Sequence, residues 1–214
     1  MSHLDQIPIN FLLADDHSLI RQGIAFLLDD LSLDHSVFHA SNLQQTLEMI
    51  KKNPIHIAII DAHFPDGNSL SVLPEIKKMS SETKILIFTG IDENVHALKF
   101  INAGAHGFLS KLSEEEEIKR AILKMQNDGE YISATTQALV MNSFRNPTLI
   151  NPLYGLTERE LQIAELYAKG NGNLEIANLL DLKQNTVSTI KKRIFEKLKV
   201  ENIVELIELI KNHQ

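Results

Sequence analysis

Five positions in this sequence carry side chains that together could handle a phosphoryl group. Two acids, Asp15 and Asp16, follow one apolar run, and Asp61, Thr89 and Lys111 stand at the ends of three others. Three carboxylates, a hydroxyl and an ammonium suit a divalent cation with a phosphoryl group, because Mg²⁺ prefers carboxylate and phosphate oxygens. A carboxylate such as Asp61 can also attack phosphorus and form an acyl phosphate.

The apolar runs before these residues are predicted to be strands of one parallel sheet. Each run is followed by a stretch in which apolar residues recur at helical spacing. This alternation implies an α/β doubly wound sheet with right-handed crossovers, and such sheets bind ligands outside the carboxyl ends of their strands. The predicted strands are Ile9–Ala14, Ser36–Ala40, Ile55–Ile60, Ile85–Phe88 and Gly107–Leu109.

The helices between these strands have partly recognisable ends. Asn42 could cap the second helix, and Ser113 with Glu116 matches a capping box at the start of the last. The second strand is short and contains His39, so it suits an edge of the sheet. The predicted helices are Ser18–Leu28, Asn42–Lys51, Ser69–Met79, Asn94–Ala103 and Ser113–Asn127.

Each of the strand-end residues also has a simpler explanation. An acid after a strand often does no more than cap the next helix, and Asp15 or Asp16 could do only that. Their joint occurrence at four strand ends favours a shared pocket, since the carboxyl ends of parallel strands meet at one edge of a sheet. The nine histidines show no zinc-ligand spacing, so a zinc centre is not expected.

The sequence changes character between Ser143 and Gly155. This stretch contains two prolines, a glycine and asparagines, and it is expected to belong to a linker. Only helical patterns follow it, and Thr157 with Glu160 matches a capping box at the first of them. The remaining predicted helices are Asn173–Leu180, Gln184–Leu198 and Glu201–Lys211.

The charge distribution separates the two parts as well. The net charge of −7 falls entirely on residues 1–151, and residues 152–214 are neutral. Within the neutral part, residues 183–199 carry six basic side chains and one acid. A basic second helix after a tight turn indicates a helix-turn-helix that binds double-stranded DNA.

Composition excludes several other classes of protein. The absence of cysteine rules out disulfides, thiolate zinc sites and cysteine nucleophiles. Residues 1–8 lack the basic and apolar regions of a signal peptide. No apolar run approaches the ~18 residues of a membrane-spanning helix. A cytoplasmic protein with no membrane partner is therefore expected.

The strand-end residues resemble those of the receiver domain of two-component response regulators, over about residues 8–128. In that family a sensor histidine kinase phosphorylates the aspartate that corresponds to Asp61. The match implies Mg²⁺ as the cofactor, with Asp16 as its main ligand. Asp15, Asp61 and the backbone carbonyl of His63 would complete the protein ligands. The resemblance also implies a flavodoxin-like sheet with strand order 2-1-3-4-5.

The switch residues of the receiver family match with three departures. Thr89 matches the hydroxyl position, Lys111 the phosphate-binding lysine, and Phe108 the aromatic residue that is expected to turn inward on phosphorylation. Phe108 replaces a frequent Tyr, and Leu112 replaces a frequent Pro. In the loop after the phosphoacceptor, the family's frequent Asp/Asn-Gly is replaced by Asn68-Ser69.

The carboxyl-terminal part resembles the LuxR-type helix-turn-helix, with matches in Asn173–Ala177 and Thr186-Val187. Together with the receiver, this is the layout of the NarL/FixJ class of transcriptional regulators. By that match Ser188, Thr189 and Lys192 occupy base-reading positions, and Ser188 replaces a frequent Lys. The other expected DNA contacts, mostly to phosphates, are Lys183, Gln184, Lys191 and Arg193.

The combined prediction is a transcription factor that is switched by phosphorylation, with no metabolic substrate. A homodimer on DNA is expected because helix-turn-helix proteins commonly bind paired half-sites. The expected parts are a receiver at 1–128, a linker at 129–155 and a helix-turn-helix domain at 156–214. One open alternative is a haloacid-dehalogenase-like phosphatase, which usually has a second acid where this chain has His63. The other is a phosphorylation-independent DNA-binding or interaction protein with a receiver-like fold.

Overall fold

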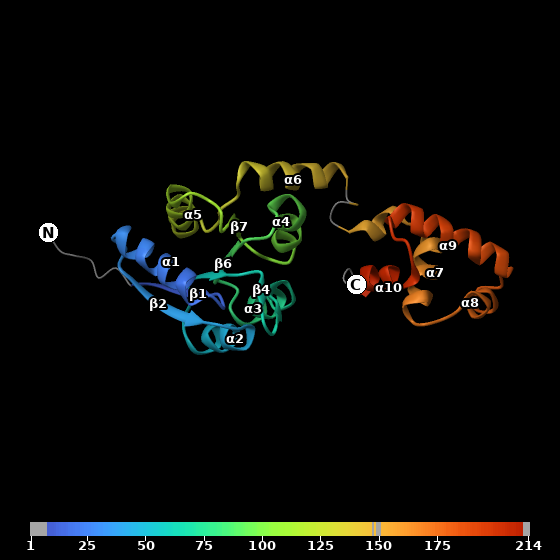
Figure 1. The fold of residues 1–214 in the computed structure, drawn as a ribbon, viewed down its shortest axis with the longest axis horizontal. Coiled ribbons are helices and arrows are strands. Elements are labelled where there is room, and N and C mark those ends of the chain that lie inside the picture. Colours follow the sequence, from blue (N-terminus) through green and yellow to red (C-terminus); the bar gives the residue numbers. More distant parts are fainter. Residues whose placement is uncertain (1–7, 147, 149–150, 212–214) are drawn as a thin grey trace. The chain divides into compact units, whose positions relative to one another are not determined.

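The chain forms two units, which divide after Val140. The computed structural model describes residues 8–146, 148 and 151–211, so the predictions for residues 1–7 and Pro147 lie outside the described residues. The first unit is a parallel sheet with helices on both faces (Figure 1). The second unit consists of helices (Figure 1).

The predicted sheet order is confirmed. Five parallel strands pair in the order β2-β1-β3-β6-β7, which is the 2-1-3-4-5 arrangement, with β2 at an edge. A small antiparallel hairpin of β4 and β5 follows β3. The strands are β1 Ile9–Ala14, β2 His35–Ala40, β3 Ile57–Ile60, β4 His63–Phe64, β5 Gly67–Asn68, β6 Lys84–Thr89 and β7 Gly107–Ser110.

Of two predicted helix starts, one is confirmed and the other is wrong. Asn42 caps α2 as predicted, because its side chain accepts the backbone N–H of Gln45 at 2.8 Å. The predicted capping box of Ser113 is wrong: α5 begins only at Glu115, and its N-cap residue makes no side-chain capping bond. A 3₁₀ turn, Ser69–Ser71, precedes α3. The helices are α1 Ser18–Asp30, α2 Leu43–Lys52, α3 Leu73–Met79, α4 Glu93–Asn102 and α5 Glu115–Asn127.

The central strands are apolar on both faces because both faces are covered. Along β1, Leu12 packs into the core with α2, α3 and α4, while Phe11 and Leu13 pack into the core with α1 and α5. The same alternation holds in β3, where Ile60 faces the first core and Ile59 the second. A period of two with apolar residues at every position is the pattern of a buried parallel strand. The helices therefore fix the strands, and the strand ends fix the polar residues that follow them.

The segment expected to be a linker contains an ordered helix, α6 Ala134–Arg145. It is preceded by Tyr131, whose backbone N–H donates to His106 at 3.0 Å beside β7. At the start of α6 the carboxylate of Glu93 accepts bonds from Ser133 and from the buried Thr136, the latter at 2.7 Å. These contacts join residues some 40 positions apart, so local sequence patterns did not reveal them.

Gly107 allows this approach to the edge of the sheet. A Cβ atom at Gly107 would lie 2.8 Å from the carbonyl oxygen of Tyr131 and 2.9 Å from Leu86. Such distances are too short for real Cβ contacts, so a larger residue would push the segment away from β7. The glycine at this position thus serves packing of the chain after α5.

The second unit is a four-helix domain with its own core, preceded by a 3₁₀ turn at Pro152–Gly155. The predicted capping box is confirmed: Thr157 and Glu160 exchange both bonds at the start of α7. Val187, Ile194 and Leu198, which recur at helical spacing, face the core. The helices are α7 Glu158–Ala168, α8 Asn173–Leu179, α9 Gln184–Leu198 and α10 Ile203–Lys211. Among the described helices, none is both long and apolar enough to cross a membrane.

A pH-sensitive contact lies at the start of β6. The Nδ1 atom of His106 accepts the backbone N–H of Ile85 at 3.1 Å, which requires the neutral ring. Burial lowers the pKa of His106 below 6.5, and the charges of Lys84 and Lys77 lower it further against the opposing effect of Glu130. Its contribution to stability is therefore present above the unfolded-state pKa and is lost as the pH falls through the folded-state pKa.

His106→Ala is expected to flatten the loss of stability on acidification. Between pH 7 and pH 5 the free energy of unfolding should fall less in the variant than in the parent, by on the order of 1 kcal/mol or less because the ring is partly open to solvent. Denaturant unfolding at several pH values measures the difference. Parallel pH profiles for the two proteins would show that His106 does not couple folding to protonation.

Candidate functional site

The predicted polar residues meet at the carboxyl edge of the sheet. Backbone hydrogen bonds continue past the strands, with Asp61 donating to Ala14 at 2.8 Å and Lys111 donating to Thr89 at 2.8 Å. Asp15 likewise donates to Ala40 at 3.1 Å. These bonds hold the residues that follow adjacent strands at one level of the sheet. The structure therefore brings these side chains to one edge of the sheet, as the sequence predicted.

Lys111 joins two of the carboxylates. Its Nζ atom lies 2.6 Å from Oδ2 of Asp15 and 2.7 Å from Oδ2 of Asp61. Asp15 is 4% exposed and Asp61 6% exposed, so the ion pairs are shielded from solvent. Burial acts to lower the pKa of Lys111, but hydrogen bonds and charge from Asp15 and Asp61 outweigh it and raise the pKa above its ordinary value. Lys111 is therefore a fixed cation at neutral pH.

Asp16 is the open carboxylate of the pocket. Its side chain is 30% exposed, and its Oδ1 atom lies 2.8 Å from Nδ1 of His17. The same Nδ1 atom lies 3.1 Å from Oδ1 of Asp15. One ligand atom from each of Asp15, Asp16, His17 and Asp61 fits within a span of 4.8 Å, and oxygen-rich sets of this kind suit a hard divalent cation. His17 was missed in the sequence, although its place directly after the acid pair was the available signal.

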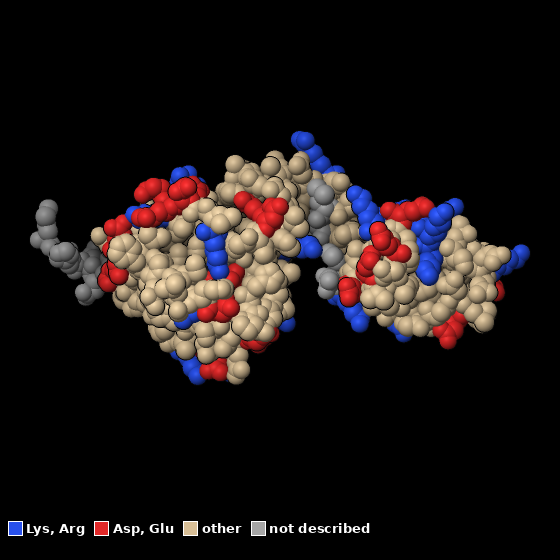
Figure 2. Space-filling model, viewed as in Figure 1, with Lys and Arg blue, Asp and Glu red and all other residues tan. Residues whose placement is uncertain are grey.

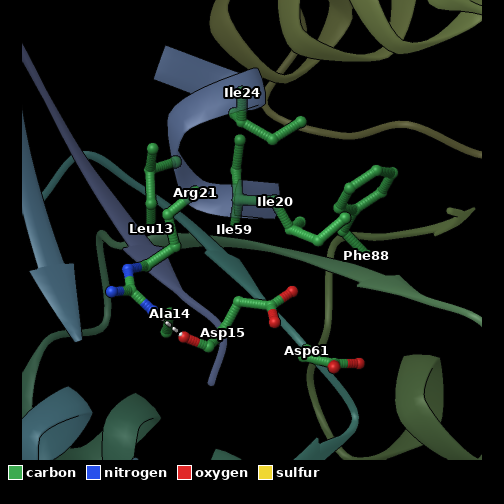
Figure 3. Close-up of a pocket in the computed structure, with 9 residues that line it drawn as sticks. All are labelled: Leu13, Ala14, Asp15, Ile20, Arg21, Ile24, Ile59, Asp61 and Phe88. Carbon is green, nitrogen blue, oxygen red and sulfur yellow. Dashed lines mark hydrogen bonds between the residues drawn. The ribbon is translucent and has the colours of Figure 1, made fainter. Parts of the chain in front are cut away.

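The cavity beneath the acids is too small for a phosphoryl group. Its volume is about 10 Å³, roughly the room for one water molecule. Its walls are mostly apolar, and Arg21 closes one side by donating to the backbone carbonyl of Asp15 (Figure 3). The carboxylates of Asp15 and Asp61 lie beside one another in this view. A phosphoryl group must therefore approach from the open rim, where Asp16 is exposed.

The two switch positions are both buried. Thr89 and Phe108 are each 1% exposed. The Phe108 ring packs 5.9 Å from the ring of Phe100 in α4. Phe108 thus already points inward in this structure. Phosphorylation therefore need not turn it inward, contrary to the expectation from the sequence.

The loop after Asp61 is held by an acid that the sequence did not single out. Both carboxylate oxygens of Asp66 accept the backbone N–H of Leu43, at 3.1 and 3.0 Å, and one also accepts from Gln44. Asp66 therefore ties the β4–β5 hairpin to the positive end of α2. Gly67 has φ +145°, a backbone conformation that favours glycine and closes the hairpin. His63 lies in β4, paired with Asn68.

Lys111→Met is expected to lower the free energy of unfolding by about 1–3 kcal/mol in a metal chelator, because two buried carboxylates lose their cation. Mg²⁺ should then stabilise the variant more than the parent, since the added cation replaces the ammonium. Thermal unfolding with and without Mg²⁺ measures both effects. Lys52→Met removes an exposed pair with Glu48 and serves as a control, whose stability should change little because exposed ion pairs contribute little. Equal Mg²⁺ responses of the parent and Lys111→Met would contradict this view of the pocket.

The basic helix α9 presents a mixed surface. Lys183, Gln184, Thr189, Lys192 and Arg193 are exposed. Two other predicted DNA contacts, Lys191 and Ser188, interact with side chains of the same unit. The ammonium of Lys191 lies 5.5 and 5.3 Å from the ring centroids of Tyr167 and Phe195, and Ser188 is bonded to Asn173.

Near the end of α9, the ammonium of Lys197 pairs with the carboxylate of Glu160 at 2.6 Å. This contact ties the end of α9 to the start of α7, and the Lys197 side chain stays 41% exposed. Basic and acidic side chains lie close together on the visible face of this unit (Figure 2). Only part of the basic stripe is therefore available to a phosphate backbone.

Comparison with known proteins identifies the family of each part of the chain. Residues 11–123 match the response regulator receiver domain, and residues 155–210 match the bacterial regulatory proteins of the luxR family. Response regulator UvrY of Escherichia coli K12 is 32% identical over 96% of this chain and 94% of its own length. Response regulator GacA of Pseudomonas aeruginosa is 30% identical over 96% of each chain.

Solved structures show the same fold. The RcsB–DNA complex has a TM-score of 0.62 at 20% identity and covers 97% of this chain and 100% of that one. A structure of RcsB from Salmonella typhimurium has a TM-score of 0.67 at 21% identity, over 95% and 99% of the two chains. The family is one of regulators, which removes the phosphatase alternative. The chain belongs to the response regulators, with a receiver domain followed by a DNA-binding helix-turn-helix domain of the LuxR type.

Proposed function

We propose that Asp61 accepts a phosphoryl group from a sensor histidine kinase and that the phosphorylated receiver controls DNA binding by α9. One observation carries the proposal. The Asp61 carboxylate lies at the open edge of the sheet beside Asp15, and Lys111 contacts both at 2.6 to 2.7 Å. This contact supports a role for Asp61 as the nucleophile and for Lys111 as the cation that binds the transferred group.

The transfer step follows from these positions. An Oδ atom of Asp61 attacks phosphorus, the phosphorus–nitrogen bond to the donor imidazole breaks, and the imidazole leaves with the bonding electrons. The new acyl phosphate brings oxygens near Lys111, whose ammonium can pair with them in place of the carboxylate. The Thr89 hydroxyl is proposed to donate to another of these oxygens, which would shift the end of β6 and bias the packing of α4.

Mg²⁺ is the proposed cofactor, and when bound it would balance the negative charge of the transferring group. Asp16, Asp15, Asp61 and the backbone carbonyl of His63 are its proposed ligands. The clustering of the carboxylates within 4.8 Å supports this set. The exposure of Asp16 leaves room for the waters that Mg²⁺ retains.

The output is proposed to be DNA binding by a homodimer in the cytoplasm. One solved structure is described as two RcsB dimers bound to two parallel DNAs, which supports a homodimer on DNA here. Thr189 and Lys192 are the proposed base-reading residues on the exposed face of α9. Proposed phosphate contacts are Lys183, Gln184 and Arg193, with Lys191 contributing if it leaves its aromatic partners. The proposed parts are the receiver at 1–128, a linker region at 129–155 that includes α6, and the DNA-binding domain at 156–214.

A phosphoryl-incorporation experiment tests the input half of this proposal. The full chain is incubated with a small acyl phosphate donor in Mg²⁺ or in a chelator, and its intact mass is measured. One added phosphoryl group is expected in Mg²⁺ and none in the chelator, with reduced incorporation in Asp16→Asn. Equal incorporation with and without Mg²⁺ would contradict a metal-assisted transfer to Asp61.

A further inference from the structure

A chain of hydrogen bonds links three helices of the DNA-binding unit through Ser188. The Tyr167 hydroxyl in α7 donates to Oδ1 of Asn173 at 2.7 Å. The Nδ2 atom of Asn173, at the start of α8, donates to Oγ of Ser188 in α9 at 3.0 Å. Ser188 in turn donates to the backbone carbonyl of Gln184 at 3.1 Å. The chain thus runs from the core of the unit to the first turns of α9.

The chemistry of each group leaves Ser188 little capacity for another partner. A serine hydroxyl has one proton, and here the Gln184 carbonyl accepts it. One of its two acceptor positions is taken by Asn173. The orientation of the Asn173 amide is itself set, because Tyr167 is 4% exposed and its hydroxyl needs an acceptor. Ser188 could donate to a base only after its hydrogen bond to the Gln184 carbonyl breaks.

Apolar packing alone would set the rotation of α9 less precisely than these hydrogen bonds do. Ile176, Ala177 and Val187 are 0–3% exposed and press α8 against α9. Such contacts set the distance between two helices, but they tolerate small rotations because they are not directional. A directional bond from Asn173 to Ser188, on the helix face next to the apolar stripe, fixes the rotation. The rotation of α9 decides where Thr189 and Lys192 point.

We propose that Asn173 is a positioning residue for DNA recognition, and that Ser188 receives its bond rather than reading a base. This inference rests on the proposed DNA-binding function of α9. It predicts that removing either side chain weakens binding to all DNA sequences alike. It also predicts that the effects of the two removals overlap, since one bond is lost in both cases.

The test uses the full chain and a DNA probe selected from a random-sequence pool by the parent protein. Asn173→Ala and Ser188→Ala should each lower affinity by about 3- to 10-fold, and the double variant by no more than the larger single effect. Ser188→Thr keeps the hydroxyl and should retain most of the affinity. Repeated site selection with each variant should return the same base preferences. Thr189→Ala, whose hydroxyl bonds only within its own helix to Asn185, is the matched control and should change those preferences.

Two outcomes would overturn the proposal. A relaxed preference at a single base position in Ser188→Ala, with all preferences intact in Asn173→Ala, would make Ser188 a base reader. Additive losses in the double variant would show that the two side chains act separately.

Hydrogen exchange of the free protein gives a readout that needs no DNA. Amides of residues 184–188 should exchange faster in Asn173→Ala and Ser188→Ala than in the parent or in Thr189→Ala. Unchanged exchange in Asn173→Ala would refute the positioning role even if DNA binding itself were not found. Failure of the parent to select any DNA, with the exchange result as expected, would instead count against the proposed function.

Discussion

Asp61→Asn is expected to abolish phosphorylation of the receiver. The substitution keeps the size of the side chain and removes the carboxylate oxygen that would attack phosphorus. Intact-mass measurement after incubation with an acyl phosphate donor and Mg²⁺ should show the parent modified and Asp61→Asn unmodified.

The control is Asp66→Asn, which changes an acid five residues away in the hairpin that follows Asp61. Asp66 caps α2 through bonds to Leu43 and Gln44 and takes no part in the pocket. This variant should lose some stability, about 0.5–2 kcal/mol, and still be phosphorylated. Phosphorylation of Asp61→Asn to the level of the parent would place the phosphoacceptor elsewhere.

Lys192→Ala is expected to lower DNA affinity by roughly 5- to 150-fold, equivalent to about 1–3 kcal/mol, and to relax base preference at one position. The reason is the exposure of Lys192 on α9 without a partner of the kind that holds Lys191 against aromatic rings. Titrations of a selected DNA probe at several salt concentrations measure the loss.

Arg193→Ala serves as the comparison for the Lys192 result. As a proposed phosphate contact, Arg193 should weaken binding to all sequences evenly and reduce the slope of affinity against salt by about one. If Lys192→Ala changed neither the affinity nor its salt dependence, α9 would not be the recognition helix.

The sequence predicted most of the site because the site depends on strand ends. Each of Asp15, Asp61 and Lys111 follows a buried apolar run, and in a parallel sheet such positions share an edge. The strand order itself came from the family resemblance, and the pairing confirms it. The buried face of α9 was equally predictable, since Val187, Ile194 and Leu198 recur at helical spacing.

What the sequence did not reveal depends on contacts between distant residues. Helix α6 begins where Ser133 and Thr136 meet Glu93, a pairing that no local pattern encodes. Asp66 reaches back 23 positions to cap α2. The start of α5 was misplaced because the Ser113 backbone N–H donates to Ser110 in a turn. The helix begins at Glu115, one residue later than a capping box at Ser113 requires.

The central claim is that phosphorylation of Asp61 changes DNA binding. It is tested most directly by the DNA affinity of the parent and of Asp61→Asn, each with and without an acyl phosphate donor in Mg²⁺. Phosphodonor should raise the affinity of the parent by about 5- to 150-fold, the usual range of coupling between two sites, and leave Asp61→Asn unchanged. Equal affinity of both proteins in all conditions would contradict the claim and favour a regulator that binds DNA independently of phosphorylation.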